Sequence, residues 1–182
     1  MAASMAALDI ASMPRYRRYF EHGQTLFLSL VTAERRPWLS DDAAKAIALI
    51  ALREARRHHP FVHHGHVLLN DHLHLMLSPV TGVAIPDLVG SFKRAVLARL
   101  PCESHGHGNR LWQRRYYDHV VRDPDDFARH LDYLHFNPVK HGLVSDAGSW
   151  RWSSLAMWQA RGGYPSDWGR LEPKDMPADV GE

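Results

Sequence analysis

The sequence predicts an α+β domain in which an antiparallel sheet carries its helices mainly on one face. The chain has 182 residues, 45% of them hydrophobic, which is enough apolar material for one substantial core. Strand-like and helix-like segments follow one another in the order β, α, β, β, α, β, α, which is typical of this class. No repeat or Gly/Ser-rich linker divides the chain, so we expect one domain over residues 15–170, with a flexible N-terminal tail (1–14) and a C-terminal tail (171–182).

The first half of the chain predicts one strand, one helix and a hairpin. Residues 25–32 (TLFLSLVT) are apolar and β-branched, as in a strand. Ser40 is a suitable N-cap for a helix over residues 41–59, which begins with acidic residues and ends with basic ones, as the helix dipole favours. Pro60 ends that helix. Residues 61–69 and 73–78 then predict two strands joined by a turn at Asn70-Asp71.

The second half predicts two amphipathic helices separated by a strand. Residues 86–100 place four apolar side chains at spacings of four, namely Leu88, Phe92, Val96 and Leu100. A Gly/His-rich loop (103–109) follows, and residues 115–122 predict the fourth strand. Asp123 and Pro124 form an N-cap followed by proline at the first helical position, which predicts a third helix running to about Phe136.

Charge is distributed unevenly although the net charge is only +2. Residues 1–122 hold 16 basic and 10 acidic side chains, whereas residues 123–182 hold 6 and 10, which indicates one basic face. Arginine outnumbers lysine by 18 to 4, and its planar guanidinium suits phosphate, although a GC-rich genome produces the same bias.

The sequence also indicates where the protein works. The single cysteine, Cys102, excludes an internal disulfide and fits the reducing cytoplasm. No apolar run approaches the ~18 residues of a membrane span, and residues 1–13 lack the pattern of a secretion signal. We therefore expect a cytoplasmic protein with no membrane partner.

Histidine is unusually frequent, with 14 in the chain. At this frequency, roughly one His-x-His pattern is expected by chance. The chain has three: His64-Gly65-His66, His72-Leu73-His74 and His105-Gly106-His107. Only the second lies in an alternating segment, whose leucines would face the core while both imidazoles share the other face. Two such imidazoles can bind one metal ion, or can simply be surface histidines. We interpret the first pair as structural and the third as solvated.

The third helix offers further candidate ligands. Tyr133 and Asn137 are four residues apart and share one helical face. If that face lies over the open side of the sheet, Asn137 would join His72 and His74 as an oxygen ligand, with Tyr133 beside the ion. Such a ligand set suits Mg²⁺ or Mn²⁺ about as well as zinc. Taken alone, Tyr133 could equally be a packing aromatic and Asn137 a cap for the turn at Pro138.

Several segments in order resemble a known family. They are YRRYF (16–20), FVHHGHVLLNDHLHLMLSP (61–79), LWQRRYYDHVVRDPDDFARHLDYLHFNPVKHGLV (111–144), WRWSS (150–154) and GGYPSDWG (162–169). Together they resemble the single-tyrosine HUH transposases, and most closely the REP-associated tyrosine transposases, over about residues 16–169. The joint occurrence of these motifs is far more specific than any one of them.

The resemblance implies an HUH fold, related to the ferredoxin-like plan, with the nucleophile helix over the side of the sheet opposite the other helices. It implies that Tyr133 is the nucleophile and that His72, His74 and Asn137 bind a divalent metal, Mg²⁺ or Mn²⁺. The expected reaction joins Tyr133 to a DNA 5′-phosphate and releases a 3′-hydroxyl, which can later reverse the step. His130, one helical turn before Tyr133, is a candidate base.

Two points leave alternatives open. The family commonly has proline two residues before the first histidine, whereas Leu69-Asn70-Asp71 precedes His72 here. Tyr116 and Tyr117 are rival nucleophiles, but they lie in a strand pattern and match the aromatic pair that follows Trp-Gln in the family.

The expected partner is single-stranded or hairpin DNA of the repetitive extragenic palindrome type. Candidate DNA contacts combine basic and aromatic side chains, although each basic residue could be ordinary solvated surface. They are Arg15, Tyr16, Arg17, Arg18, Lys93, Arg94, Arg114 and Arg115. The resemblance favours a monomer over a homodimer. The competing functions are a hairpin-binding module that does not cleave, and a metal-dependent phosphodiesterase that uses water.

Overall fold

The computed structural model describes residues 23–100, 110–178 and 180, and it confirms the α+β class. Its four strands are β1 (Leu26–Val31), β2 (Phe61–Leu68), β3 (His72–Pro79) and β4 (Tyr117–Val120). They form one sheet in the order β2-β3-β1-β4, and every neighbouring pair is antiparallel. Strand β1 is therefore central, and it borders both the β3 histidines and β4.

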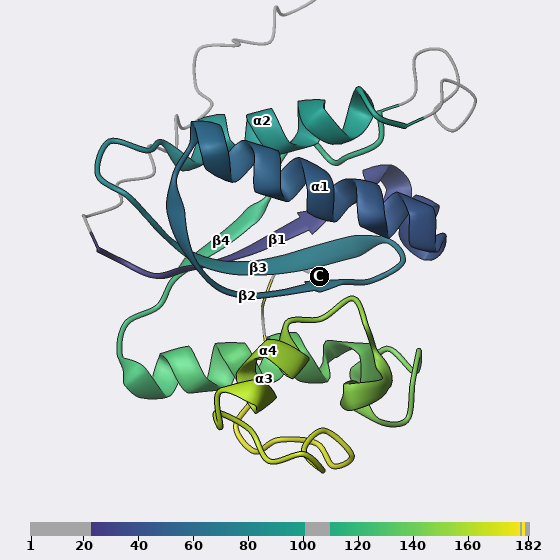
Figure 1. Cartoon of the computed structure of the whole chain (residues 1–182), viewed down its shortest axis with the longest axis vertical. Coiled ribbons are helices and arrows are strands. Elements are labelled where there is room, and N and C mark those ends of the chain that lie inside the picture. Colours follow the sequence, from purple (N-terminus) through teal and green to yellow (C-terminus); the bar gives the residue numbers. More distant parts are fainter. Residues whose placement is uncertain (1–22, 101–109, 179, 181–182) are drawn as a thin grey trace, which may run out of the picture.

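Helices cover both faces of this sheet (Figure 1). The four α-helices are α1 (Asp42–His58), α2 (Ile85–Leu97), α3 (Pro124–Lys140) and α4 (Leu155–Ala160). Short 3-10 turns are η2 (Ala33–Arg35), η3 (Trp38–Ser40) and η5 (Ala147–Ser149). Helices α1 and α2 pack side by side on one face, whereas α3 and the short α4 lie across the other. The expected placement of the third helix opposite the first two is confirmed.

Alternation along the strands creates two separate cores. On β3, Leu73, Leu75 and Leu77 join the cluster beneath α1 and α2. Because side chains on a strand alternate between faces, His72 and His74 point to the α3 face. Met76 continues that row and belongs to a second apolar cluster with residues of α3. The α3 face thus mixes apolar side chains with two buried imidazoles.

Helix α3 is longer than the sequence predicts. It continues past Phe136 through Pro138 to Lys140, so the interpretation of Asn137 as a cap is wrong. The end of the helix is closed instead by backbone bonds, with His141 N–H donating to the Asn137 carbonyl at 3.0 Å, and by Gly142 at φ 66°. The Asn137 side-chain amide is therefore inside the last turns of a buried helical face.

Other boundaries differ by a few residues. Asp41, not Ser40, caps α1 by accepting from the Ala43 N–H at 3.3 Å. Strand β4 covers only Tyr117–Val120, because it pairs with β1 over just four positions. Among the described residues, no helix combines the length and apolar character needed to cross a membrane.

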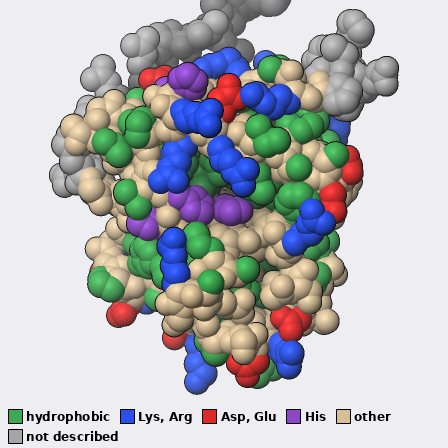
Figure 2. Space-filling view, in the orientation of Figure 1, with side chains coloured by type: hydrophobic (Ala, Val, Ile, Leu, Met, Phe, Trp, Pro, Cys, Tyr) green, Lys and Arg blue, Asp and Glu red, His purple; other side chains and the backbone are tan. Residues whose placement is uncertain are grey.

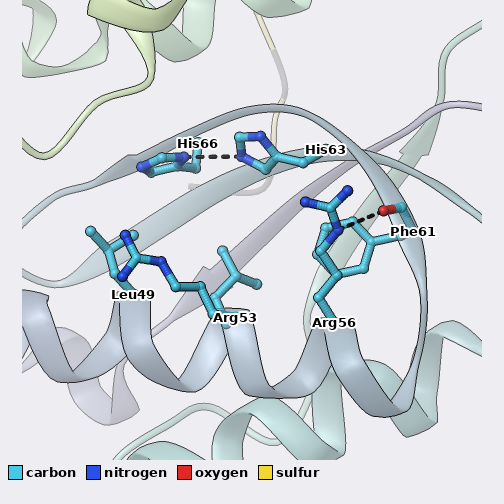
Figure 3. Close-up of a pocket in the computed structure, with 7 residues that line it drawn as sticks. Leu49, Arg53, Arg56, Phe61, His63 and His66 are labelled. Carbon is cyan, nitrogen blue, oxygen red and sulfur yellow. Dashed lines mark hydrogen bonds between the residues drawn. The ribbon is translucent and has the colours of Figure 1, made fainter.

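The edge strand β2 is tied to both helical layers. Pro60 follows α1, and the Arg56 Nε donates to the Phe61 carbonyl at 2.9 Å. Figure 2 shows Lys and Arg side chains around a hollow, with histidines beside it. Arg56 and Phe61 also line a pocket between α1 and β2 (Figure 3). Trp158, on α4, donates to the His64 carbonyl at 2.7 Å, so this indole fastens the C-terminal part to the sheet.

Candidate active site between β3 and α3

The structure brings together the four side chains to which the sequence points. The ring centroids of His72 and His74 are 4.9 Å apart, and that of Tyr133 is 5.5 Å from that of His74. Asn137 lies one helical turn beyond Tyr133 on the buried face of α3. All four are buried, with Tyr133 only 1% exposed. Two segments about 60 residues apart in sequence therefore form one polar cluster inside an apolar layer.

The Asp71 carboxylate determines the tautomer of His72. Its Oδ1 accepts a hydrogen bond from Nδ1 of His72 at 2.6 Å, while Oδ2 accepts from Arg35 at 3.0 Å. Burial raises the pKa of the Asp71 carboxyl, but the hydrogen bonds and charges of His72 and Arg35 outweigh it, and the pKa lies below its ordinary value. Because Nδ1 carries the proton, the neutral imidazole has its lone pair on Nε2.

The turn before His72 is held in place despite its departure from the family pattern. Lys45, buried on α1, donates from Nζ to the Asn70 side chain and to the Ser40 carbonyl, both at 3.2 Å. The Asp71 carbonyl also accepts from the Thr32 N–H at 2.8 Å. These bonds replace the rigidity that proline would supply, and Asp71 adds a direct contact to His72.

A similar relay orients His74. Ser29, its direct neighbour on β1, donates its only hydroxyl proton to the Val180 carbonyl at 2.5 Å. The Ser29 oxygen must then accept from Nδ1 of His74, which lies 2.8 Å away. His74 is thus left with its lone pair on Nε2, like His72. Hydrogen-bonded Nδ1 atoms with Nε2 lone pairs are the usual arrangement of metal-binding histidines, so two imidazoles and an amide oxygen fit a divalent cation.

Lys140 contacts the candidate nucleophile, and sequence reasoning missed it. Its Nζ donates to the Tyr133 hydroxyl at 2.8 Å and lies 4.5 Å from the centre of the phenol ring. The two residues are seven apart, or two helical turns, so the spacing could have identified the pair. A cation at this position stabilises the phenolate relative to the phenol.

Two further residues of the site lie outside the predicted set. Ser29 could have been noticed as a polar residue inside the apolar strand LFLSLV. Val180, which is 2% exposed, belongs to the same apolar cluster as Tyr133 and has no local sequence signal, because 151 positions separate it from Ser29. Since Tyr133 is buried in this arrangement, a phosphate reaches its hydroxyl only after covering groups move.

Tyr116 and Tyr117, the rival nucleophiles, lie farther from the histidine pair than Tyr133 does. Tyr117 lies opposite Ser29 on β4, so it shares a row with His74 but has β1 between them. Two strand spacings put their backbones about 9.5 Å apart. Tyr116 packs against the core beneath α1 and α2. Tyr133 is the tyrosine in ring contact with His74.

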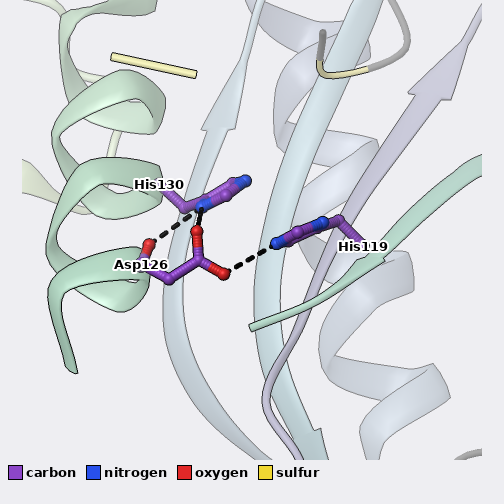
Figure 4. A group of neighbouring side chains, drawn as sticks. All are labelled: His119, Asp126 and His130. Carbon is purple, nitrogen blue, oxygen red and sulfur yellow. Dashed lines mark hydrogen bonds and ion pairs between the residues drawn. The ribbon is translucent and has the colours of Figure 1, made fainter. Parts of the chain in front are cut away.

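A second polar cluster joins β4 to the start of α3 (Figure 4). His119 Nε2 lies 2.9 Å from Asp126 Oδ2, and the ring of His130 stacks on that of His119 at 4.4 Å. Nδ1 of His130 bonds to the Asp126 carbonyl at 2.8 Å, and burial lowers the pKa of this histidine. Burial raises the pKa of Asp126, but bonds from Arg122 and His119 reverse this and hold it well below its ordinary value.

The same cluster is compatible with a metal ion. The candidate ligand atoms of His119, Asp126 and His130 lie within 4.8 Å of one another. Arg122 already donates to the Asp126 carboxylate at 3.0 Å, which compensates its charge. His130 thus fastens α3 to β4, whereas the hydrogen bond to the Tyr133 hydroxyl comes from Lys140.

The predicted DNA contacts divide into three groups. Lys93, Arg94 and Arg114 come together with Arg110 around a pocket of about 360 Å³. Lys93 donates to the Gln113 carbonyl at 2.7 Å, and burial lowers its pKa to about 8. Arg115 is exposed beside this pocket but does not line it. The remaining group, Arg15, Tyr16, Arg17 and Arg18, lies outside the described residues.

Comparison with known proteins agrees with the resemblance. The family described as IS200-like transposase matches residues 24–135. The REP-associated tyrosine transposase of Escherichia coli K12 is 32% identical over 157 residues, covering 86% of this chain and 91% of the relative. A Haemophilus influenzae relative assigned to the same group is 33% identical over 178 residues, covering 92% of this chain and all of the relative. The chain belongs to the REP-associated tyrosine transposases.

The fold agrees with this membership. A solved structure of a REP-associated tyrosine transposase bound to a REP hairpin matches with a TM-score of 0.74 and 28% identity. The match covers 92% of this chain and 99% of that one. Membership of the REP-associated tyrosine transposases is compatible with metal use by the chain, as is the His119-Asp126-His130 cluster.

Proposed function

We propose that this protein cleaves and rejoins single-stranded DNA beside a REP-like hairpin, through a covalent 5′-phosphotyrosine at Tyr133. The observation that carries the proposal is the juxtaposition of the Tyr133 phenol with Lys140 on one side and the His74 imidazole on the other. A nucleophile, a cation that stabilises its anionic form and two imidazoles that can bind a metal ion are the groups that phosphoryl transfer needs.

The donor set suggests how a cofactor would be held. Nε2 of His72, Nε2 of His74 and the Asn137 amide oxygen would bind a divalent cation, either Mg²⁺ or Mn²⁺. Such an ion offsets the negative charge of a phosphodiester and orients it for in-line attack. Asp71 and Ser29 keep both imidazoles in the required tautomer, since each accepts a hydrogen bond from an Nδ1–H.

The chemical step uses atoms of this chain. The Tyr133 oxygen forms a bond to phosphorus as the bond from phosphorus to the 3′-oxygen breaks. The phenol loses its proton and the departing 3′-oxygen gains one, so no net proton is consumed. Lys140 stabilises the phenolate by donating to the attacking oxygen. The product is itself a phosphodiester, so another 3′-hydroxyl reverses the step without ATP.

The basic pocket supplies a surface for the hairpin. One hollow between α2 and the segment before β4 is lined by four cations, Lys93, Arg94, Arg110 and Arg114. Clustered cations of this kind neutralise backbone phosphates without reading sequence. Support for hairpin DNA as the partner comes from the relative that was solved with a REP hairpin. We expect the chain to act in the cytoplasm. We also expect it to be a monomer, and light scattering of the purified protein measures its oligomeric state.

The test is formation of a covalent adduct. Purified protein is incubated with end-labelled hairpin DNA carrying a single-stranded flank, with Mg²⁺ or Mn²⁺, and run on a denaturing gel. We expect a protein–DNA adduct with the wild type, and none with Tyr133→Phe. Tyr117→Phe is the matched control, because it removes the same hydroxyl from a nearby tyrosine and should leave the adduct intact.

Other results would identify the competing functions. Cleaved DNA without an adduct, still produced by Tyr133→Phe, would mean that water is the nucleophile. Hairpin binding without cleavage under either metal would mean a non-cleaving DNA-binding module. An adduct lost in Tyr117→Phe and kept in Tyr133→Phe would transfer the nucleophile to β4.

A further inference from the structure

A second basic pocket lies between α1 and the edge strand β2, on the face opposite the candidate nucleophile. It has a volume of about 180 Å³ and is lined by Arg53 and Arg56 of α1, His63 and His66 of β2, and three apolar side chains, Leu49, Leu52 and Phe61 (Figure 3). Phe61 belongs to the core beneath α1 and α2, whereas Tyr133 belongs to the core beneath α3. The pocket is thus distinct from the site described above.

Its cations lack acidic partners. Among the described residues, neither Arg53 nor Arg56 forms an ion pair with a carboxylate, and no carboxylate lines the pocket. This contrasts with Arg99, which lies just after α2 and pairs with Glu54. Arg56 is oriented by its bond to the Phe61 carbonyl, so its remaining guanidinium N–H groups are presented in a defined direction. Two neighbouring guanidiniums, one of them oriented by a hydrogen bond and neither paired with a carboxylate, favour an anion.

The two half-buried histidines add one N–H donor rather than charge. His63 Nε2 and His66 Nδ1 are 3.0 Å apart and share a hydrogen bond. Burial first, then the charges of Arg56, His64 and Arg161, lowers the pKa of His63 to about 4. Burial, His63 and Arg53 lower the pKa of His66 to about 3. Both imidazoles are therefore neutral near pH 7, and the arginines supply the positive potential.

The dimensions limit the occupant to a small group. Pockets for drug-sized ligands measure roughly 300–1,000 Å³, so this hollow is too small for them. The apolar side chains of Leu49, Leu52 and Phe61 exclude part of the solvent, which strengthens the attraction between a guanidinium and an anion. A tetrahedral oxyanion matches two planar guanidiniums in size and in hydrogen-bonding geometry.

We propose that this pocket binds one phosphate group, held by Arg53 and Arg56 with the His63–His66 pair as an additional donor. The phosphate belongs to a DNA backbone or to a free phosphate, and both present the same chemistry. As a DNA site, it rests on the proposed function, and it would anchor the nucleic acid on the side of the sheet away from Tyr133.

The test compares Arg53→Gln with Arg57→Gln. Both substitutions remove one exposed arginine from α1, but Arg57 does not line the pocket. The first arm titrates inorganic phosphate into each protein by calorimetry. The second arm measures hairpin DNA binding across a salt series, in which each lost phosphate contact reduces the slope of log K against log salt by about 0.7–0.9. Circular dichroism checks that both variants are folded.

Two outcomes support the site and separate its sources. A salt slope that falls by about 0.7–0.9 more in Arg53→Gln than in Arg57→Gln identifies a DNA phosphate. Phosphate binding lost only in Arg53→Gln, with equal salt slopes, identifies a free phosphate. No phosphate binding by the wild type together with equal slopes overturns the proposal.

Adduct formation at saturating DNA separates this inference from the proposed function. We expect Arg57→Gln, which lies outside the pocket, to form the Tyr133 adduct at the wild-type rate once DNA is saturating. If the wild type forms no adduct, the proposed chemistry fails, while the phosphate titration still decides whether the pocket is a site.

Discussion

Replacing Lys140 with methionine tests whether this cation activates the nucleophile. The variant keeps a side chain of similar length against the Tyr133 ring but removes the charged donor 2.8 Å from the phenol oxygen. A hydrogen bond to a charged group contributes about 1.5–3 kcal/mol. Lys140 is exposed, so we take the lower end of this range. A loss of about 1.4 kcal/mol corresponds to a tenfold change in rate.

The expected result is a roughly tenfold slower single-turnover formation of the adduct at neutral pH. The deficit should shrink as pH rises, because a higher pH restores the phenolate that the ammonium no longer stabilises. The assay is adduct formation at saturating DNA across a pH series, by rapid quench and denaturing gel. Lys140→Arg, which keeps a cationic donor, serves as the control and should retain most of the rate.

Two results would refute this reasoning. An unchanged rate and pH profile in Lys140→Met would mean that the contact with the Tyr133 hydroxyl has no part in the chemistry. An equal deficit at every pH, accompanied by weaker DNA binding, would mean that Lys140 binds the substrate phosphate and does not stabilise the phenolate.

Three further predictions concern Ser29, Val180 and His66. Ser29→Ala removes the acceptor for Nδ1 of His74, so the Mn²⁺ concentration needed for half-maximal adduct formation should rise about tenfold or more, whereas Ser78→Ala should leave it unchanged. A chain ending at Ala178 loses the buried Val180 and its bond to Ser29, together worth about 2–3 kcal/mol, so adduct formation should increase roughly 30- to 150-fold if these contacts restrict access; an unchanged rate would show that they do not. Because folding lowers the pKa of His66 to about 3, the unfolded chain binds more protons than the folded chain below about pH 6.5. The free energy of unfolding from urea titrations should therefore decrease as pH falls below about 6.5, and less steeply in His66→Gln.

The nature of the elements and much of the site could be predicted from local patterns. The alternation of histidine and leucine in HLHLML assigns the imidazoles to one face of a strand wherever that strand lies in the sheet. The spacing of Tyr133 and Asn137 similarly places both on one side of a helix. The ends of the helices and strands could be predicted less well than their type. Helix α3 passes through Pro138, because backbone bonds beyond the proline and Gly142 close its end, and propensity alone favours an earlier stop.

The contacts that tune the site depend on residues remote from one another in the chain. Ser29 and Val180 are 151 positions apart, and Lys45 on α1 supports the turn before His72 on β3. Neither contact has a periodic signal. The phosphate pocket is similar, since Arg53 and His66 are ordinary polar residues until α1 packs against the edge of the sheet.

The amino-acid sequence by itself determined the family, the order of strands and helices, and the residue types that could perform phosphoryl transfer. These follow from short-range spacing, because strand and helix periods dictate which side chains share a face. Only the tertiary structure decided that Tyr133 meets Lys140 and His74, that His72 and His74 are held with the proton on Nδ1, and that Val180 packs in the same apolar cluster as Tyr133. Hydrogen-bond partners and burial depend on packing between distant segments, which no local pattern encodes.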